Sequence, residues 1–252
     1  MSTLNPGLAV SVHCYQGDVA QVRMFLPLYE HHQAPVIILS PEDSPVVGIG
    51  PHHCYYEGCG QVGYTGHHTW TRQKKQMQRL LALPQEFQLF LMNDADSFCL
   101  SPKLPKYLYE DDNTLWSNLV DDFRVPGTFS HGVHWPHDYH AGMPQKAAQP
   151  PYVLHRKAMQ KIVDAIDKVP LCPICPFIDW IMVAAPHIAG VKLARFHSCL
   201  SINTKTPEEI SALEYSIVNR GATFIHSIKD KAGFVACKTA YAARIGTHPD
   251  ER

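Results

Sequence analysis

Apolar runs and amphipathic segments alternate through the first hundred residues. Residues 8–15 and 34–40 are short, apolar, β-rich runs of the kind that is buried in parallel sheets. Residues 17–32 and 69–83 instead repeat their apolar side chains at helical spacing. A third apolar run covers residues 88–92 and leads directly into two aspartates. Strands that alternate with helices in this way predict an α/β domain with a mostly parallel central sheet flanked by helices.

The second half of the chain is less regular. A strand is expected over residues 113–120, and residues 121–150 are rich in Pro, Gly and His without periodicity, which is typical of a functional loop. The pattern then predicts five more elements: a strand running into an amphipathic helix (151–169), a buried helix stopped by Pro186 (177–187), a capped helix (206–221) and a last strand (222–228).

Polar residues follow the first three predicted strands at the point where each one ends. These are His13 to Tyr15, Glu42 with Asp43, and Asp94 with Asp96. In open parallel sheets, ligands bind outside the carboxyl ends of the strands. The sequence therefore predicts that these three clusters meet at one edge of the sheet.

Composition limits the setting in which the protein works. The chain has 252 residues, 45% of them hydrophobic, which is enough for one sizeable core. It shows neither a long apolar run nor a basic and then apolar start, so neither membrane insertion nor secretion is expected. A net charge of -1 and a pI of about 7.0 give no overall attraction to nucleic acid. The eight cysteines are expected as reduced thiols, which predicts a cytoplasmic protein of a bacterium or a phage-infected host.

The pair Asp94 and Asp96 raises a question of charge, because two carboxylates at the end of a buried strand repel one another. A hard divalent cation, Mg²⁺ or Mn²⁺, would neutralise them and leave coordination positions for phosphate oxygens. Such a metal would act as a Lewis acid toward a departing diphosphate. The alternative is that one aspartate caps the next segment while the other is solvated.

The segment "LFLMNDADSF" resembles the D-x-D segment of GT-A-fold glycosyltransferases, which use nucleotide-sugar donors, and the order of elements is similar from Leu8 to Asp230. The resemblance implies that Asp96 ligates the metal directly, and that Asp94 contacts the ribose or shares the metal. It also implies one GT-A-like domain over residues 1–252. A nucleotide-sugar half (about 8–100) and an acceptor and catalytic half (about 101–230) would be followed by a tail (231–252).

Three further residues match the family pattern in the second half. His226 would complete the metal site and Lys229 would reach the diphosphate, whereas His226 alone would be an ordinary strand histidine. Asp179 would be the general base of an inverting enzyme, or would stabilise positive charge on the sugar in a retaining one. The alternative for Asp179 is an acid that interacts with its own helix dipole. Many relatives have two adjacent acids here, and this chain has Ile178 before Asp179.

Donor recognition is expected from the first half of the chain, and the expected donor is a UDP-sugar. By the same resemblance, His13, Cys14 and Tyr15 would hold the base and ribose. Asp43 would read a pyrimidine edge, and Arg72 would reach the ribose or diphosphate. Each of these residues also fits an ordinary loop or surface position.

The acceptor stays open between a glycan, a small molecule and a 5-hydroxymethylated base in DNA. A basic rim suited to DNA would come from seven residues: Lys103, Lys106, Arg124, Lys146, Arg156, Lys157 and Lys161. The histidines of residues 131–140, with Trp135 and Tyr139, are expected in an acceptor-binding loop.

Two other functions compete with the transferase. A phosphatase of the haloacid dehalogenase type also uses D-x-D, but it expects Thr or Val where this chain has Phe98. A non-catalytic glycan-binding module, or a module stapled by zinc at Cys172 and Cys175, is the third hypothesis. The usual partner for the cysteine pair, a second C-x2-C or a close His pair, is absent from the sequence.

Overall fold

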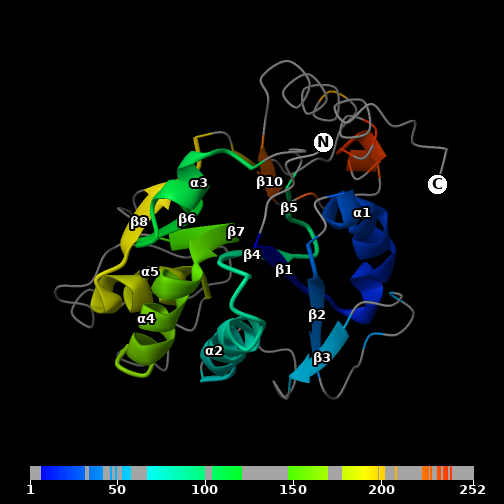
Figure 1. Ribbon diagram of the computed structural model, residues 1–252. Helices are drawn as coiled ribbons and strands as arrows, with labels where there is room; N and C mark the ends of the chain where they lie inside the picture. The colour runs from blue at the N-terminus through cyan, green and yellow to red at the C-terminus, as the bar shows by residue number, and fades with distance from the viewer. Residues whose placement is uncertain are drawn as a thin grey trace, which may run out of the picture.

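The computed structural model describes the chain in segments, and all statements about structure refer to them. They are residues 7–31, 34–41, 46, 49, 53–57, 67–99, 104–120, 147–169, 178–197, 199–201, 208, 223–226, 228, 232–233, 235–237 and 239. Within these segments the chain folds around one large mixed sheet with helices on both faces (Figure 1).

The large sheet has seven strands in the order β3-β2-β1-β4-β7-β6-β8. Their bounds are Leu8–His13 (β1), Val36–Pro41 (β2), His53–Glu57 (β3), Leu89–Asp94 (β4), Thr114–Val120 (β6), Ala147–His155 (β7) and Lys192–Arg195 (β8). Only β7 runs against the others, since it pairs antiparallel with both β4 and β6 while the remaining pairs are parallel. The predicted mostly parallel sheet is confirmed.

Helices cover both faces of this sheet. Their bounds are Val19–His31 (α1), His67–Leu81 (α2), Tyr107–Glu110 (α3), Arg156–Ile166 (α4) and Ile178–Ala189 (α5), with a short 3-10 turn at Gln16–Asp18 (η1). On one face α2, α4 and α5 pack through Met77, Met159 and Met182 against Phe90 and Leu115. Burying an apolar side chain of this size contributes about 1.5–3 kcal/mol, so this layer is a main source of stability.

The other face is covered by α1 and by a small three-stranded sheet in the order β5-β10-β9. Its strands are Phe98–Cys99 (β5), Cys199–Ser201 (β9) and Phe224–His226 (β10). Phe224 is fully buried and stacks on Phe196, with ring centroids 4.2 Å apart. The small sheet therefore joins the segment that directly follows β4 to the last described strand of the chain.

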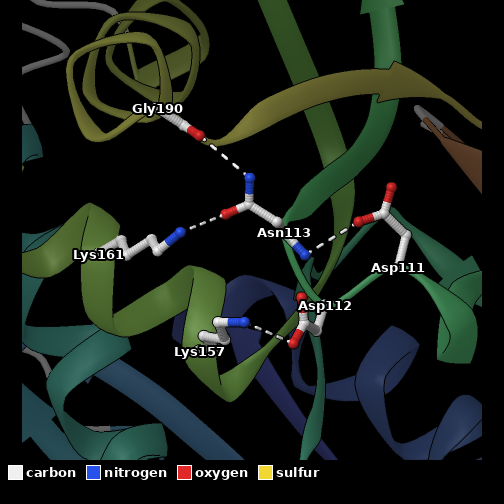
Figure 2. Close-up of polar contacts among 6 residues, drawn as sticks. All are labelled: Asp111, Asp112, Asn113, Lys157, Lys161 and Gly190. Atoms are coloured by element: carbon white, nitrogen blue, oxygen red, sulfur yellow. Dashed lines mark hydrogen bonds and ion pairs between the residues drawn. The ribbon is translucent and has the colours of Figure 1, made fainter.

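A polar cluster lies at the end of the large sheet where its parallel strands begin, which we call the amino edge (Figure 2). The Asn113 amide donates to the carbonyl of Gly190 after α5 (3.1 Å) and accepts from Lys161 of α4 (2.7 Å). Lys157 pairs with Asp112 at 2.9 Å. These contacts attach the turn before β6 to the start of α4 and the end of α5.

Arg156 is buried rather than part of a basic rim, which corrects the expectation from the sequence. Its guanidinium donates to the carbonyls of Leu81, Leu83, Pro84 and Phe87 at 2.7–3.0 Å. Burial without a carboxylate partner lowers the pKa of Arg156. A cation at the carboxyl end of α2 also complements the helix dipole, so Arg156 holds the loop between α2 and β4.

Several predicted boundaries need correction. The helix expected to stop at Pro186 continues to Ala189. A proline lacks one N–H donor, but its carbonyl still accepts a hydrogen bond, here from Val191 N–H at 2.9 Å. The stretch assigned to a loop over 121–150 includes the start of β7 at Ala147. Apart from residue 208, the helix expected over 206–221 lies outside the described segments. None of the helices in the described ranges is long and apolar enough to cross a membrane.

Candidate functional site

The carboxyl ends of β1 and β4 bring the first predicted site residues together. His13 and Asp94 end their strands as direct register partners. Side chains alternate along a strand, and Ala9 and Phe90 pack on the α2 face. His13 and Asp94, four residues further on, therefore lie on that same face. Asp94 is half-buried and His13 is buried.

The two aspartates lie in a tight turn, residues 94–97, which we call the acid turn. Ser97 N–H donates to the Asp94 carbonyl at 3.1 Å, and the Ser97 hydroxyl donates to the Asp96 carboxylate at 3.3 Å. The Ser97 side chain is buried, whereas Asp96 is partly exposed. The turn thus directs the second carboxylate toward the surface at the carboxyl edge of the sheet.

The acid turn is tied directly to the segment that follows β10. Strand β5 begins at Phe98 and pairs antiparallel with β10, and Ile228 N–H donates to the Asp96 carbonyl at 3.3 Å. His226 ends β10, two residues before this hydrogen bond, and is partly buried. The structure therefore places His226 in the segment hydrogen-bonded to the Asp96 backbone, although more than a hundred residues separate them in sequence.

The loop after β1 continues along the same edge. Cys14 N–H donates to the Leu39 carbonyl of β2 at 2.9 Å, and the Cys14 thiol is buried against the Tyr15 carbonyl at 3.3 Å. Tyr15 is partly exposed, and its N–H donates to Asp18 at 3.2 Å. Of this trio, the side chain of Tyr15 is more accessible to a ligand than those of His13 and Cys14.

The remaining predicted residues are placed only in part. Asp179 is the second residue of α5 and Arg72 lies within α2, but their side chains are outside the described set. Helix α5 ends beside Gly190 at the amino edge, so its first turn, with Asp179, begins toward the carboxyl edge. Asp43 and Lys229 lie outside the described segments, as do Cys172 with Cys175 and residues 131–140.

Among solved structures, the chain is similar to WbbM, a bifunctional glycosyltransferase. The alignment covers 98% of this chain and 52% of WbbM, with a sequence identity of 10% and a TM-score of 0.54. The fold is that of a GT-A-like glycosyltransferase. The chain spans about half the length of WbbM.

Two other glycosyltransferase structures align with the GT-A-like fold more loosely. One is a glycosyltransferase involved in the glycosylation of the major capsid of PBCV-1, at 11% identity and a TM-score of 0.44 over 94% of this chain and 99% of that protein. The other is the catalytic domain of Drosophila β1,4-galactosyltransferase 7, at 11% identity and a TM-score of 0.39 over 75% of this chain and 63% of that domain. No model of a known protein family matches the chain. No curated protein matches its sequence.

Within this GT-A-like fold, the acid turn offers oxygen ligands that suit Mg²⁺ or Mn²⁺. The described residues hold no group of three or more His, Cys, Asp and Glu side chains arranged to bind a metal. Two carboxylates fit a metal that arrives together with diphosphate oxygens, because Mg²⁺ is usually held by one or two carboxylates and substrate phosphates. In the small sheet, burial raises the pKa of the Cys199 thiol of β9 to about 12, so this thiol is mostly protonated at neutral pH.

Sequence reasoning missed two polar residues of this site. Gln76 of α2 lies within 2.7 Å of His13, and its amide nitrogen donates to Ser11 of β1 at 2.8 Å. The sequence contained a signal for Gln76. This residue lies one position before Met77 and four before Leu80, on the apolar stripe of helix α2. A polar residue on such a stripe indicates a buried partner.

Proposed function

We propose that the protein is a metal-dependent glycosyltransferase that moves a sugar from a nucleoside-diphosphate sugar to an acceptor hydroxyl. The observation that carries this proposal is the hydrogen bond from Ile228 to the Asp96 carbonyl. This bond and the pairing of β5 with β10 bring the aspartate pair and the His226 segment to one edge of a GT-A-like fold.

The aspartates and His226 have the metal and donor roles in this proposal. Asp96 and Asp94 would hold Mn²⁺ or Mg²⁺, with His226 as a further ligand. The metal supplies Lewis-acid stabilisation of the departing diphosphate. Asp94 lies beside His13 and would also contact the donor ribose. The nucleoside would then bind near His13, and the phosphates would bind near Asp96 and His226.

Other residues would orient the donor and activate the acceptor. Tyr15, with Cys14 and His13 behind it, would line the base and ribose pocket, Asp43 would read a pyrimidine base, and Arg72 and Lys229 would meet the diphosphate. Asp179, in the first turn of α5, would take the proton from an acceptor hydroxyl or stabilise positive charge on the sugar. A UDP-sugar is the donor we propose to test first.

The acceptor that we propose is a glycan or a small molecule rather than DNA. Of the seven basic residues considered for a DNA rim, Arg156 is buried, and Lys157 and Lys161 bond Asp112 and Asn113 at the amino edge. That edge is opposite the acid turn. A hydroxymethylated DNA base therefore gains no support from these three residues, and its test is binding that falls steeply with salt.

The first experiment is thermal unfolding with a panel of nucleoside diphosphates, each with and without Mn²⁺. A ligand at a hundredfold its dissociation constant adds about 2.7 kcal/mol to native stability, which a melting curve detects. We expect one diphosphate, UDP first, to raise the Tm only when Mn²⁺ is present. The variant Asp96→Asn should lose this shift, and Asp164→Asn, an exposed aspartate on α4, should keep it.

Turnover then tests the reaction itself. The diphosphate that binds should appear as a product when its sugar conjugate is incubated with acceptors and Mn²⁺, and Asp179→Asn should slow its release. If no nucleotide shifts the Tm with or without metal, the donor site is wrong and the phosphatase and binding-module hypotheses take precedence.

A further inference from the structure

A chain of buried polar side chains connects α2 to the end of β1. Ser11, His13 and Gln76 are exposed by 0%, 6% and 1%. The surrounding interface is apolar, with Ala9 on the strand and Met77 and Leu80 on the helix. Polar groups in such a place cost stability unless their hydrogen bonds are made, and here they bond one another.

The geometry of the chain assigns a tautomer to His13. The Gln76 amide nitrogen donates to the Ser11 hydroxyl at 2.8 Å, which turns the amide oxygen toward His13. That oxygen lies 2.7 Å from Nε2 of His13. In this orientation the amide oxygen accepts, which assigns the proton to Nε2 of His13 and lets Gln76 set the tautomer and the orientation of the ring.

His13 is also the direct neighbour of the first aspartate of the acid turn. The two residues are register partners at the ends of β1 and β4, and both face α2. The ring of His13 is therefore one of the polar groups next to Asp94. Through Gln76, which contacts His13 and Ser11 of β1, helix α2 takes part in the site.

We propose that Gln76 is a positioning residue of the donor site, and that it acts by locking His13 as the Nε2–H tautomer beside Asp94. This inference rests on the proposed function, because the ligand held at this edge is the nucleoside diphosphate of the donor. Ser11 is also needed, because its hydroxyl accepts the buried hydrogen bond from the amide nitrogen of Gln76.

The chain offers a matched control on the same helix. Gln73 lies one turn before Gln76 and is also 1% exposed, but its amide oxygen has no hydrogen-bond partner among the residues that the structure describes. The variants Gln76→Met and Gln73→Met each remove one buried amide and keep the volume and the helix propensity close to those of glutamine. Ser11→Ala removes the far end of the polar chain.

The experiment measures two properties of each full-length variant: the His13 tautomer, from the nitrogen shifts of the ring in long-range proton–nitrogen NMR, and the Kd for UDP with Mn²⁺ by calorimetry. We expect Nε2–H in the wild type and in Gln73→Met. Gln76→Met should lose this tautomer preference and bind UDP about tenfold more weakly, as is common for residues that orient a ligand-binding histidine. Ser11→Ala should give a mixed tautomer and a smaller loss.

The outcomes separate this inference from the proposed function. If the wild type binds UDP and Gln76→Met binds it as tightly as Gln73→Met does, the positioning role is overturned. A wild-type His13 that carries its proton on Nδ1 alone overturns it as well. If the tautomers behave as expected but the wild type binds no nucleoside diphosphate, the proposed function fails, and with it the donor role of Gln76. Melting curves of all variants distinguish lost binding from lost folding.

Discussion

At the scale of single residues, this protein uses buried polar groups to fix its loops. Arg156 satisfies four carbonyls between α2 and β4, and Gln76 joins His13 to Ser11. Arg156 resembles a surface cation in the sequence, because its neighbours His155 and Lys157 are polar, whereas Gln76 lies beside Met77 on an apolar stripe. The partners of both residues lie more than sixty residues away, so the sequence does not reveal them.

Replacing Arg156 should weaken the fold more than replacing a surface cation. We expect Arg156→Met to lower the free energy of unfolding by roughly 2–4 kcal/mol, because four carbonyls lose their donor at once and the buried guanidinium is removed from its packing. Lys168→Met, at an exposed position, should change it by less than about 0.5 kcal/mol. Urea unfolding measures both. Equal effects of the two variants would contradict the structural role of Arg156.

Asp111 should make stability depend on pH in the acid range. The hydrogen bond from the Thr114 hydroxyl, at 2.7 Å, is the largest cause that lowers the pKa of Asp111. A carboxyl whose pKa is lower in the folded state adds stability above its unfolded pKa, which is about 3.9 for Asp, and loses it as the pH falls through the folded value. Asp111→Asn should therefore be less stable than wild type at pH 7, by less than about 1 kcal/mol, and the difference should vanish once the pH falls below the lowered folded pKa.

The variant Thr114→Val provides the check on that assignment. It removes the hydroxyl and keeps the shape of the buried side chain, so it should lose stability at pH 7 but not at low pH. Urea unfolding of both single variants and the double variant over this pH range would measure the coupling. Additive losses would show that the bond to Thr114 is not the cause.

At the scale of elements, the sequence predicted the long periodic segments and the short last strand β10, and it missed other short strands. Strands β1, β2, β4 and β6 and helices α1, α2 and α4 were expected near their observed bounds. Strands β5 and β9 have two and three residues, too few for a period to appear. The reversed direction of β7 was also unpredictable, because direction depends on pairing with β4 and β6, and these partners are far away in sequence.

A substitution in the small sheet should weaken nucleotide binding, whereas one of similar cost to stability elsewhere in the core should not. We expect Phe224→Leu to cost about 1 kcal/mol and also to weaken nucleotide binding, because β10 holds the His226 segment against the acid turn. Ile162→Val, fully buried on the opposite face of the large sheet, should cost a similar amount and leave binding unchanged. Denaturant unfolding and nucleotide calorimetry on the pair would check this. Equal binding by both variants would argue against a site at the small sheet.

At the scale of the whole molecule, the large sheet crosses the boundary between the two predicted functional halves. Strand β4 lies in the first half and β7 in the second, and their pairing covers four register positions from Leu89 to Met92. A site with Asp94 from one half and His226 from the other depends on that continuity. The sequence predicted that these motifs meet at one edge of the sheet, and the structure adds the strand pairings that join the two halves there.

A fragment of residues 1–100 should not fold on its own. It would expose β4, whose first five residues are buried, together with the apolar face that α4 and α5 cover. We expect this fragment to be insoluble, and to become soluble when it is co-expressed with residues 101–252. Heteronuclear NMR spectra of the fragment alone and of the mixture would report the result, and a well-dispersed spectrum of the fragment alone would contradict it.

The reversed strand β7 also has a consequence for how this protein could diversify. Val120 ends β6 and pairs with Ala147 at the start of β7, so the chain leaves and re-enters the sheet at the same edge as the acid turn. Both ends of the interval 121–146 are therefore held by paired strands of the sheet. Under the proposed function, natural variation or grafting in that interval should change the choice of acceptor and leave the donor site unchanged.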